Sequence, residues 1–168
     1  MTSSHPDIMQ GGSDGWCSPR EVTVPLADFF GGGPRTDPCS NERSIVGAAI
    51  EYTWGGLHLP WLGETYENCP FSKTPAWTAK GLAELKSGRC TELVRLTMVA
   101  TSTKWWKLMA GYRRNPRFLF TKRLKFRGDA KTPNQGARFD TVLTYFGPRH
   151  AAFDKTFRHL ERWTSWGR

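Results

Sequence analysis

Hydrophobic and polar positions along this chain repeat with two different periods, and each period predicts one kind of element. Apolar side chains between residues 22 and 30 recur at the spacing of one helix face, with Ser18-Pro19 as a helix start and Gly31–Gly33 as its end. The segment Leu93–Val99 is the clearest strand in the sequence. By the same reasoning we expect further helices over residues 76–86, 101–112 and 151–163, with Thr101 or Thr103 as the cap of the second, and further strands over residues 117–120, 123–126 and 141–146.

The segment between the first helix and residue 52 predicts a strand that turns into a helix. Arg35–Asn41 has the composition of a strand end followed by a loop, which places Asp37 at the corner. Ser44 is positioned to cap the apolar stretch Ile45–Tyr52, so we expect a helix there. A second strand is expected to end just before the tetrapeptide Asn68–Phe71, because its proline does not suit the middle of a sheet.

The order of these elements predicts an α/β fold in a single domain. Strands that alternate with helices build a Rossmann-like sheet, and the late strands are expected to form an antiparallel edge on it. Ligands of such sheets bind at the carboxyl ends of the strands, where Asp37 and Asn68 are expected. Residues 1–15 are rich in Ser and Gly and predict a flexible leader, residues 16–168 the domain, and residues 128–137 a polar loop.

Charge is distributed unevenly along the chain. Its 168 residues carry 24 Lys+Arg and 15 Asp+Glu, a formal net charge of +9. Residues 1–84 hold 5 basic and 10 acidic side chains, whereas residues 85–168 hold 19 and 5. This predicts a neutral-to-acidic pocket for a small or cationic ligand and a separate basic face for a phosphate backbone, with a solvated basic surface as the alternative. No apolar run approaches the ~18 residues of a membrane helix and no secretory leader is recognised, so a cytoplasmic protein is expected.

The densest group of cations lies between residues 113 and 131, where eight Lys and Arg side chains accompany one acid, Asp129. On strands, alternation predicts that the interleaved Phe118, Phe120 and Phe126 point inward and that the cations, Arg117 among them, point outward. Contacts to a phosphate backbone are expected from Arg113, Arg114, Lys122, Arg123, Lys125, Arg127, Lys131 and Arg138.

Cysteine and histidine spacing argues against a metal site. The cysteines stand at positions 17, 39, 69 and 90, which matches no zinc spacing and no dense disulfide framework. The histidines at 5, 58, 150 and 159 are equally scattered. We therefore expect reduced thiols and no bound metal.

The tetrapeptide Asn68–Phe71 combines a carboxamide, a rigid turn and an aromatic ring in consecutive positions. A planar ring offers a stacking face for a flipped base, while the Asn oxygen and the next backbone carbonyl can accept the two hydrogens of an exocyclic amine. Two acceptors aimed at the amine leave its lone pair free to attack an electrophile. The alternative is an ordinary strand exit with a buried Phe.

This tetrapeptide resembles the (Asp/Asn/Ser)-Pro-Pro-(Tyr/Phe) signature of amino-group DNA methyltransferases. Its surroundings are similar to those in the phage-type Dam-like N6-adenine methyltransferases, a resemblance that runs from Trp16 to about Gly147. The segments that match in the same order are Trp16–Pro19, Asp37–Asn41, Gly56–Gly63, Thr101–Trp106, Lys122–Phe126 and Ala137–Phe139.

The resemblance implies the α/β sheet of S-adenosylmethionine-dependent methyltransferases and transfer of a methyl group to adenine in double-stranded DNA, in the host cytoplasm if the protein is phage-encoded. It implies that Asn68 and the carbonyl of Cys69 hold the amine, that Pro70 shapes the turn and that Phe71 stacks on the base. The S-adenosylmethionine pocket is implied to be lined by Trp16, Ser18, Pro19, Asp37, Pro38 and Cys39. With little chain left for a separate recognition domain, low sequence specificity is expected, and the oligomeric state is left open.

The sequence departs from the family pattern at two places. Cys69 stands where the family usually has Pro, which leaves φ unfixed and motivates an alternative, a catalytically silent homologue that binds DNA or the cofactor as a decoy or regulator. Methylation of the cytosine amino group and a nucleophilic role for Cys69 are further alternatives. The second departure is the lack of a clear Gly-x-Gly cofactor loop, and Glu51 is a candidate ribose-binding acid by position only.

Overall fold

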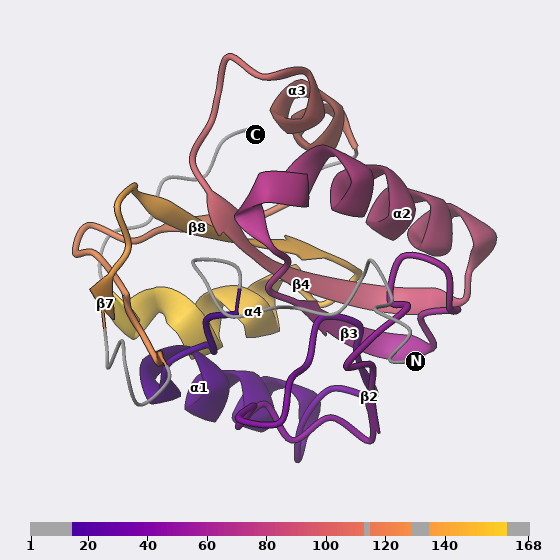
Figure 1. The fold of residues 1–168 in the computed structure, drawn as a ribbon, viewed down its shortest axis with the longest axis horizontal. Helices are drawn as coiled ribbons and strands as arrows, with labels where there is room; N and C mark the ends of the chain where they lie inside the picture. Colours follow the sequence, from indigo (N-terminus) through magenta and orange to yellow (C-terminus); the bar gives the residue numbers. More distant parts are fainter. Residues whose placement is uncertain (1–14, 113–114, 129–134, 161–168) are drawn as a thin grey trace, which may run out of the picture.

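The computed structural model describes residues 15–112, 115–128 and 135–160 and shows three layers, with a mixed sheet between two pairs of helices (Figure 1). Helices α1 (Arg20–Phe30) and α4 (His150–Phe157) cover one face. Helices α2 (Thr74–Ser87) and α3 (Lys104–Gly111) cover the other. The predicted α/β class is thus confirmed.

The sheet has six strands in the order β2-β1-β3-β4-β8-β5. The first four, β2, β1, β3 and β4, are parallel, whereas β8 is antiparallel to both of its neighbours. The strands are β1 (Thr36–Asp37), β2 (Ile50–Glu51), β3 (Gly63–Glu67), β4 (Cys90–Met98), β5 (Arg117–Leu119) and β8 (Thr141–Phe146).

The expected antiparallel edge is confirmed, because the late strands β8 and β5 pair antiparallel at one edge of the sheet. The outermost strand is β5, which runs parallel to β4, and the antiparallel strand β8 is inserted between them. Strand β8 pairs six residues with β4 but only three with β5. The longer strand therefore lies beside the nine-residue β4, where it satisfies more backbone hydrogen bonds than β5 would.

Strand β4 is the centre of the fold, and most of its residues are buried because helices cover both faces. On the α1/α4 face the core is aromatic, with Phe29, Tyr145 and Phe153 in mutual ring contact. On the α2/α3 face, Trp61 stacks on Trp77 at 6.0 Å between ring centroids. These two layers hold the strand ends that carry the candidate site.

Several local predictions are confirmed. Helix α1 ends at Gly31, as predicted, in the left-handed conformation that glycine adopts without strain, and α2 ends at Gly88 in the same conformation. Of the two proposed caps for α3, it is Thr103 whose side chain accepts a hydrogen bond from the backbone of Trp106. The last helix continues as a 3₁₀ turn to Leu160, and the rest of its predicted range lies outside the described residues.

The helix predicted over Ile45–Tyr52 is wrong, so Asp37 lies at a strand-to-loop corner. The chain instead forms a loop that ends in β2. Gly47 has φ +69°, which interrupts a right-handed helix, and the Ser44 hydroxyl accepts a hydrogen bond from Val46, two residues on, as in a local turn. The residues that follow pair with the backbone of β1 and form a strand, with Ile50 N donating a hydrogen bond to Arg35 O at 2.8 Å.

A two-stranded ribbon of β6 (Lys125–Phe126) and β7 (Gln135–Gly136) lies beside the main sheet. It is tied to the start of the described chain by a bridge between Cys17 and Arg127, whose backbone groups exchange two hydrogen bonds of 3.0 Å. The predicted strand 123–126 is thus shorter than expected, and the leader and most of the predicted polar loop lie outside the described residues.

Candidate ligand and nucleic-acid site

Asp37 and Asn68 come together at the one place where the strand order of the parallel sheet reverses. From β1 the chain passes to β2 on one side, and then to β3 and β4 on the other. Asp37 ends β1 and Asn68 directly follows β3, its neighbour in the sheet. Because open α/β sheets bind ligands outside the carboxyl ends of their strands at such a switch point, this edge is the candidate ligand site.

The carboxamide of Asn68 is held in a fixed orientation. Its Nδ2 donates to the backbone oxygen of Trp16 at 3.4 Å and to Ser18 Oγ at 3.1 Å. The hydroxyl of Ser18 in turn lies 2.7 Å from that of buried Tyr66. A backbone carbonyl can only accept, so the NH₂ group must face Trp16. The acceptor Oδ1 is then the other branch of the planar carboxamide and points away from the Trp16 carbonyl.

Phe71 lies in a cluster of aromatic rings beside Asn68. It is half-buried and contacts Phe139 edge-on at 5.0 Å and Phe126 at 6.1 Å between ring centroids. Trp16 contacts the same Phe126 ring at 6.1 Å. The buried Phe126 is core, as predicted, whereas the place of Phe139 in this cluster was not predicted, although its segment is among those that carry the resemblance.

Asp37 is a buried carboxyl group, with 3% of its surface exposed. Burial raises its pKa from 3.8 to about 7, and the negative charges of Glu51 and Glu67 act in the same direction, against one hydrogen bond from the backbone of Cys39. A cation beside Asp37 would favour its ionised form. Three residues further on, Ser40 Oγ is buried without a hydrogen-bond partner, which leaves a donor available to a bound ligand.

The other residues predicted to line a cofactor pocket differ in what they offer. Pro19 is buried, and its carbonyl accepts hydrogen bonds from the first turn of α1. Pro38 is buried against Gly56 so closely that a Cβ on Gly56 would lie 1.9 Å from the Pro38 oxygen. The side chain of Cys39 belongs to the apolar core with Trp61, which leaves its backbone as the part that can line a ligand.

Cys69 is buried and its thiol stays protonated. Burial raises the thiol pKa well above its ordinary value, and the neighbouring carboxylate of Glu67 raises it further, against the opposing effect of Arg95. Only a thiolate is a strong nucleophile, so this environment disfavours a covalent role. The four cysteines are free thiols in the structure.

The cation-rich segment, of which the structure describes residues 115–128, is called the basic segment below. It lies next to this site because the bridge between Arg127 and Cys17 brings it beside Trp16 and Asn68. Lys122, Arg123 and Lys125 are exposed on it, Arg127 is half-buried, and Arg138 is exposed in the segment that follows β7. The predicted contacts Arg113, Arg114 and Lys131 lie outside the described residues.

Arg117 corrects the prediction that every cation of this segment faces outward. It is 7% exposed, and burial lowers the pKa of its guanidinium, two of whose nitrogens have no hydrogen-bond partner. On β5, Phe118 packs against Phe153 and Phe157 of α4, so alternation places Arg117 on the opposite face of the sheet. Helices cover both faces of this sheet, and a side chain that points away from α4 is therefore buried as well (Figure 1). Phe118 and Phe120 are buried as predicted.

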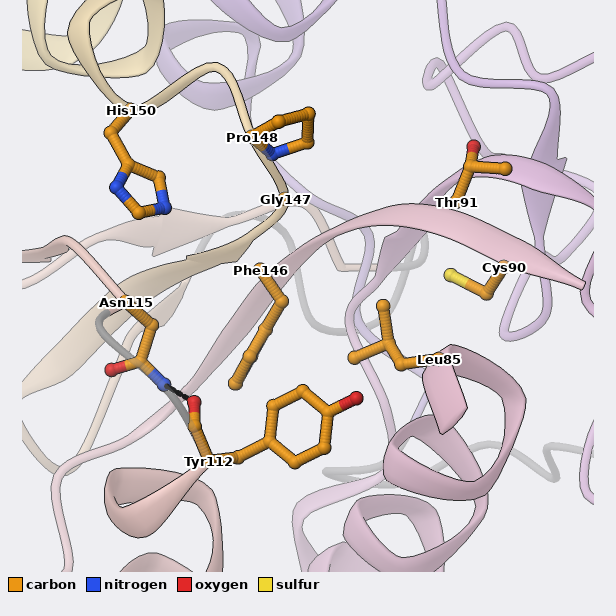
Figure 2. Close-up of a pocket in the computed structure, with 9 residues that line it drawn as sticks. All are labelled: Leu85, Cys90, Thr91, Tyr112, Asn115, Phe146, Gly147, Pro148 and His150. Atoms are coloured by element: carbon orange, nitrogen blue, oxygen red, sulfur yellow. Dashed lines mark hydrogen bonds between the residues drawn. The ribbon is translucent and has the colours of Figure 1, made fainter. Parts of the chain in front are cut away.

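A cavity of about 410 Å³ lies elsewhere, at the opposite end of β4. Figure 2 shows it between the start of β4, the end of β8 and the beginning of α4, with the amide of Asn115 turned to the carbonyl of Tyr112. It does not include the predicted site residues. Its lining residues are Leu85, Cys90, Thr91, Tyr112, Asn115, Phe146, Gly147, Pro148 and His150.

No protein-family model matches the chain, and no curated protein matches it in sequence. Within residues 15–112, 115–128 and 135–160, no helix is long and apolar enough to cross a membrane. In the same part of the chain, no three His, Cys, Asp or Glu side chains gather where they could hold a metal ion.

Proposed function

We propose that this chain is an S-adenosylmethionine-dependent DNA methyltransferase that acts on the exocyclic N6 amine of a flipped adenine with low sequence specificity. One observation carries the proposal, namely that an oriented Asn68, a buried Asp37 and the basic segment 122–127 meet at the switch-point edge of an α/β sheet. The resemblance of the tetrapeptide to the amino-methyltransferase signature supplies the reaction class.

The acceptor chemistry follows from the orientation of Asn68. Because its NH₂ group is engaged by Trp16 and Ser18, Oδ1 is left to accept one hydrogen of the amine. The carbonyl of Cys69 would accept the other, which keeps the nitrogen lone pair free. Phe71, which is half-buried and makes T-shaped contacts with two other rings, would stack on the base.

The residues at the end of β1 fit a cofactor that carries a positive charge. Asp37 provides a carboxyl group that a cation would keep ionised, and Ser40 provides a buried hydroxyl without a partner. Trp16 provides an aromatic face of the kind that attracts cations, and Glu51 ends the neighbouring strand β2. When bound there, S-adenosylmethionine would supply the methyl group as an electrophile.

The basic segment provides the electrostatic part of DNA binding. Flipping a base out of the duplex costs a few kcal/mol, which contacts to the phosphate backbone must offset. Lys122, Arg123 and Lys125 are exposed beside the aromatic cluster that would receive the base. Affinity for DNA should therefore fall steeply with salt concentration and depend little on sequence.

The test is incubation of the purified protein with unmethylated duplex DNA and S-adenosylmethionine, followed by mass spectrometry of the nucleosides. Asn68→Ala should abolish the formation of N6-methyladenine. Asn115→Ala is the matched control, because it removes a buried carboxamide that holds Met109 and Tyr112 carbonyls at the opposite end of β4, and it should keep the activity.

Other outcomes would contradict the proposal in distinct ways. N4-methylcytosine in place of N6-methyladenine would move the substrate to cytosine. Salt-sensitive DNA binding without any methylated base would favour the second candidate, a catalytically silent homologue, which Cys69 in the tetrapeptide motivates.

A further inference from the structure

A buried arginine, Arg95, contacts both ends of the turn that carries the candidate acceptors. It lies on β4 directly opposite Glu67 of β3, and both side chains are almost entirely buried, at 1% and 0% exposure. The guanidinium Nε is 3.1 Å from Glu67 Oε2 in an ion pair. Its Nη2 donates to Cys69 Sγ at 3.7 Å and to the carbonyl of Thr74 at 3.4 Å.

These contacts surround the tetrapeptide. Glu67 precedes it, Cys69 lies within it, and Thr74 follows it at the start of α2. Thr74 also reaches back, since its hydroxyl donates to the carbonyl of Phe71 at 2.9 Å. One planar guanidinium thus fixes the positions of both ends of the turn relative to β4.

Stability alone gives little reason for the chain to retain this arrangement. A buried ion pair loses its hydration, and replacement by apolar residues is often neutral or stabilising. Cysteine leaves φ free where a proline would fix it, so the turn needs a restraint from a side chain, which the contact between Arg95 and the thiol provides. A requirement that the turn keep its position would account for the desolvation cost of the buried ion pair.

We propose that Arg95 is a positioning residue, which acts through Glu67, Cys69 and Thr74 to hold Asn68 Oδ1 and the Cys69 carbonyl where they receive the amine. This inference rests on the proposed function. Arg95 touches neither DNA nor cofactor in this role. Because a displacement of reacting groups by about 1 Å can cost about 100-fold in rate, loss of the restraint should act on kcat and leave the KM for DNA nearly unchanged.

The test compares Arg95→Lys, Cys69→Ala and Cys69→Ser by steady-state kinetics and by hydrogen exchange of the amides in residues 68–73. Lysine keeps the charge but cannot reach three partners, and alanine removes the sulfur acceptor. Both should lower kcat about tenfold or more and speed the exchange of the turn, whereas serine, which keeps an acceptor, should retain most of kcat. If Arg95→Lys fails to fold, Cys69→Ala still tests the inference, because it removes the contact between the guanidinium and the thiol from the other side.

Arg149→Lys is the matched control for stability. Arg149 pairs with Glu92 at 3.0 Å and lies over the Phe29 ring, away from the turn. Its variant should lower the Tm without changing kcat or the exchange of residues 68–73. Amide exchange of residues 68–73 that is unchanged in Arg95→Lys and Cys69→Ala would overturn the inference. So would a loss of kcat in Arg149→Lys as large as that in Arg95→Lys when the two variants have the same Tm.

The exchange measurement also separates this inference from the proposed function. Faster exchange in the variants of a protein that transfers no methyl group would leave the restraint on the turn in place and refute the methyltransferase. Normal methyl transfer with unaltered exchange would refute the restraint and keep the methyltransferase.

Discussion

Replacement of Asp37 by asparagine removes a carboxyl group that is costly to ionise in its present surroundings. Asparagine has nearly the same shape and keeps the oxygen that accepts the backbone hydrogen bond of Cys39 at 3.0 Å. The substitution therefore isolates the charge. We expect the variant to be more stable than the wild type at pH 8 and to lose most of this advantage at low pH.

The magnitude follows from the pKa of Asp37, which burial raises from 3.8 to about 7. Between these values the folded state holds more protons than the unfolded state, so the stability of the wild type falls as the pH rises through this window. At about 1.4 kcal/mol per pH unit, the full penalty above pH 7 is about 4 kcal/mol, of which about 3 kcal/mol accrues between pH 5 and pH 8. The asparagine variant has no such dependence.

The measurement is urea unfolding of the wild type and Asp37→Asn at pH 5 and at pH 8. Taking the difference between the two proteins at each pH cancels the titration of all other groups. Asp140→Asn, which removes an exposed carboxylate, is the matched control and should change the free energy of unfolding only slightly. A difference for Asp37→Asn that is the same at both pH values would refute the argument that burial keeps this carboxyl protonated.

Three further predictions concern ligands. Binding of S-adenosylmethionine to the wild type should tighten from pH 6 to pH 8, because Asp37 ionises with a pKa of about 7, and calorimetry on Asp37→Asn should give weaker, pH-independent binding. Lys125→Ala should lower DNA affinity uniformly across sequences and reduce the slope of log K against log salt by about 0.9, while Lys86→Ala, an exposed cation near the end of α2, should leave the slope unchanged. Gly56→Ala should lower the Tm and cofactor affinity together, because its Cβ would lie 1.9 Å from the Pro38 oxygen, and a normal Tm would contradict this close approach.

The features that the sequence predicts correctly are those with local causes. The glycine that ends α1 and the threonine that caps α3 follow from the conformations and hydrogen bonds of single residues. The approach of Asp37 to Asn68 follows from a general rule, since both end neighbouring parallel strands. Patterns within ten or so residues were enough for these.

The features that the sequence does not predict depend on partners far along the chain. Ser18 meets Tyr66 and Asn68 across some fifty positions, and no periodicity marks such a link. Arg95 interrupts the apolar run of β4 in a way that a solvated strand face would also explain. The wrong helix over Ile45–Tyr52 shows the same limit, because pairing with β1 outweighed local apolar content there.

Two buried groups that cost stability lie on either side of the same tetrapeptide. Asp37 is held as a carboxyl group where an amide would fit, and Arg95 and Glu67 form a buried ion pair between β4 and β3. Arg117 on β5 is a further buried charge, but it lies beyond β8 and away from the tetrapeptide. Buried Glu84, by contrast, pairs with a side chain that reaches the surface, the half-exposed Arg89, at 2.7 Å. Stability alone gives no reason for the costly groups to gather at the switch-point edge. The proposed function, which requires a site for a positive ligand and two fixed acceptors, would account for both groups at once. The pH dependence of unfolding and the amide exchange of the turn test these two requirements separately.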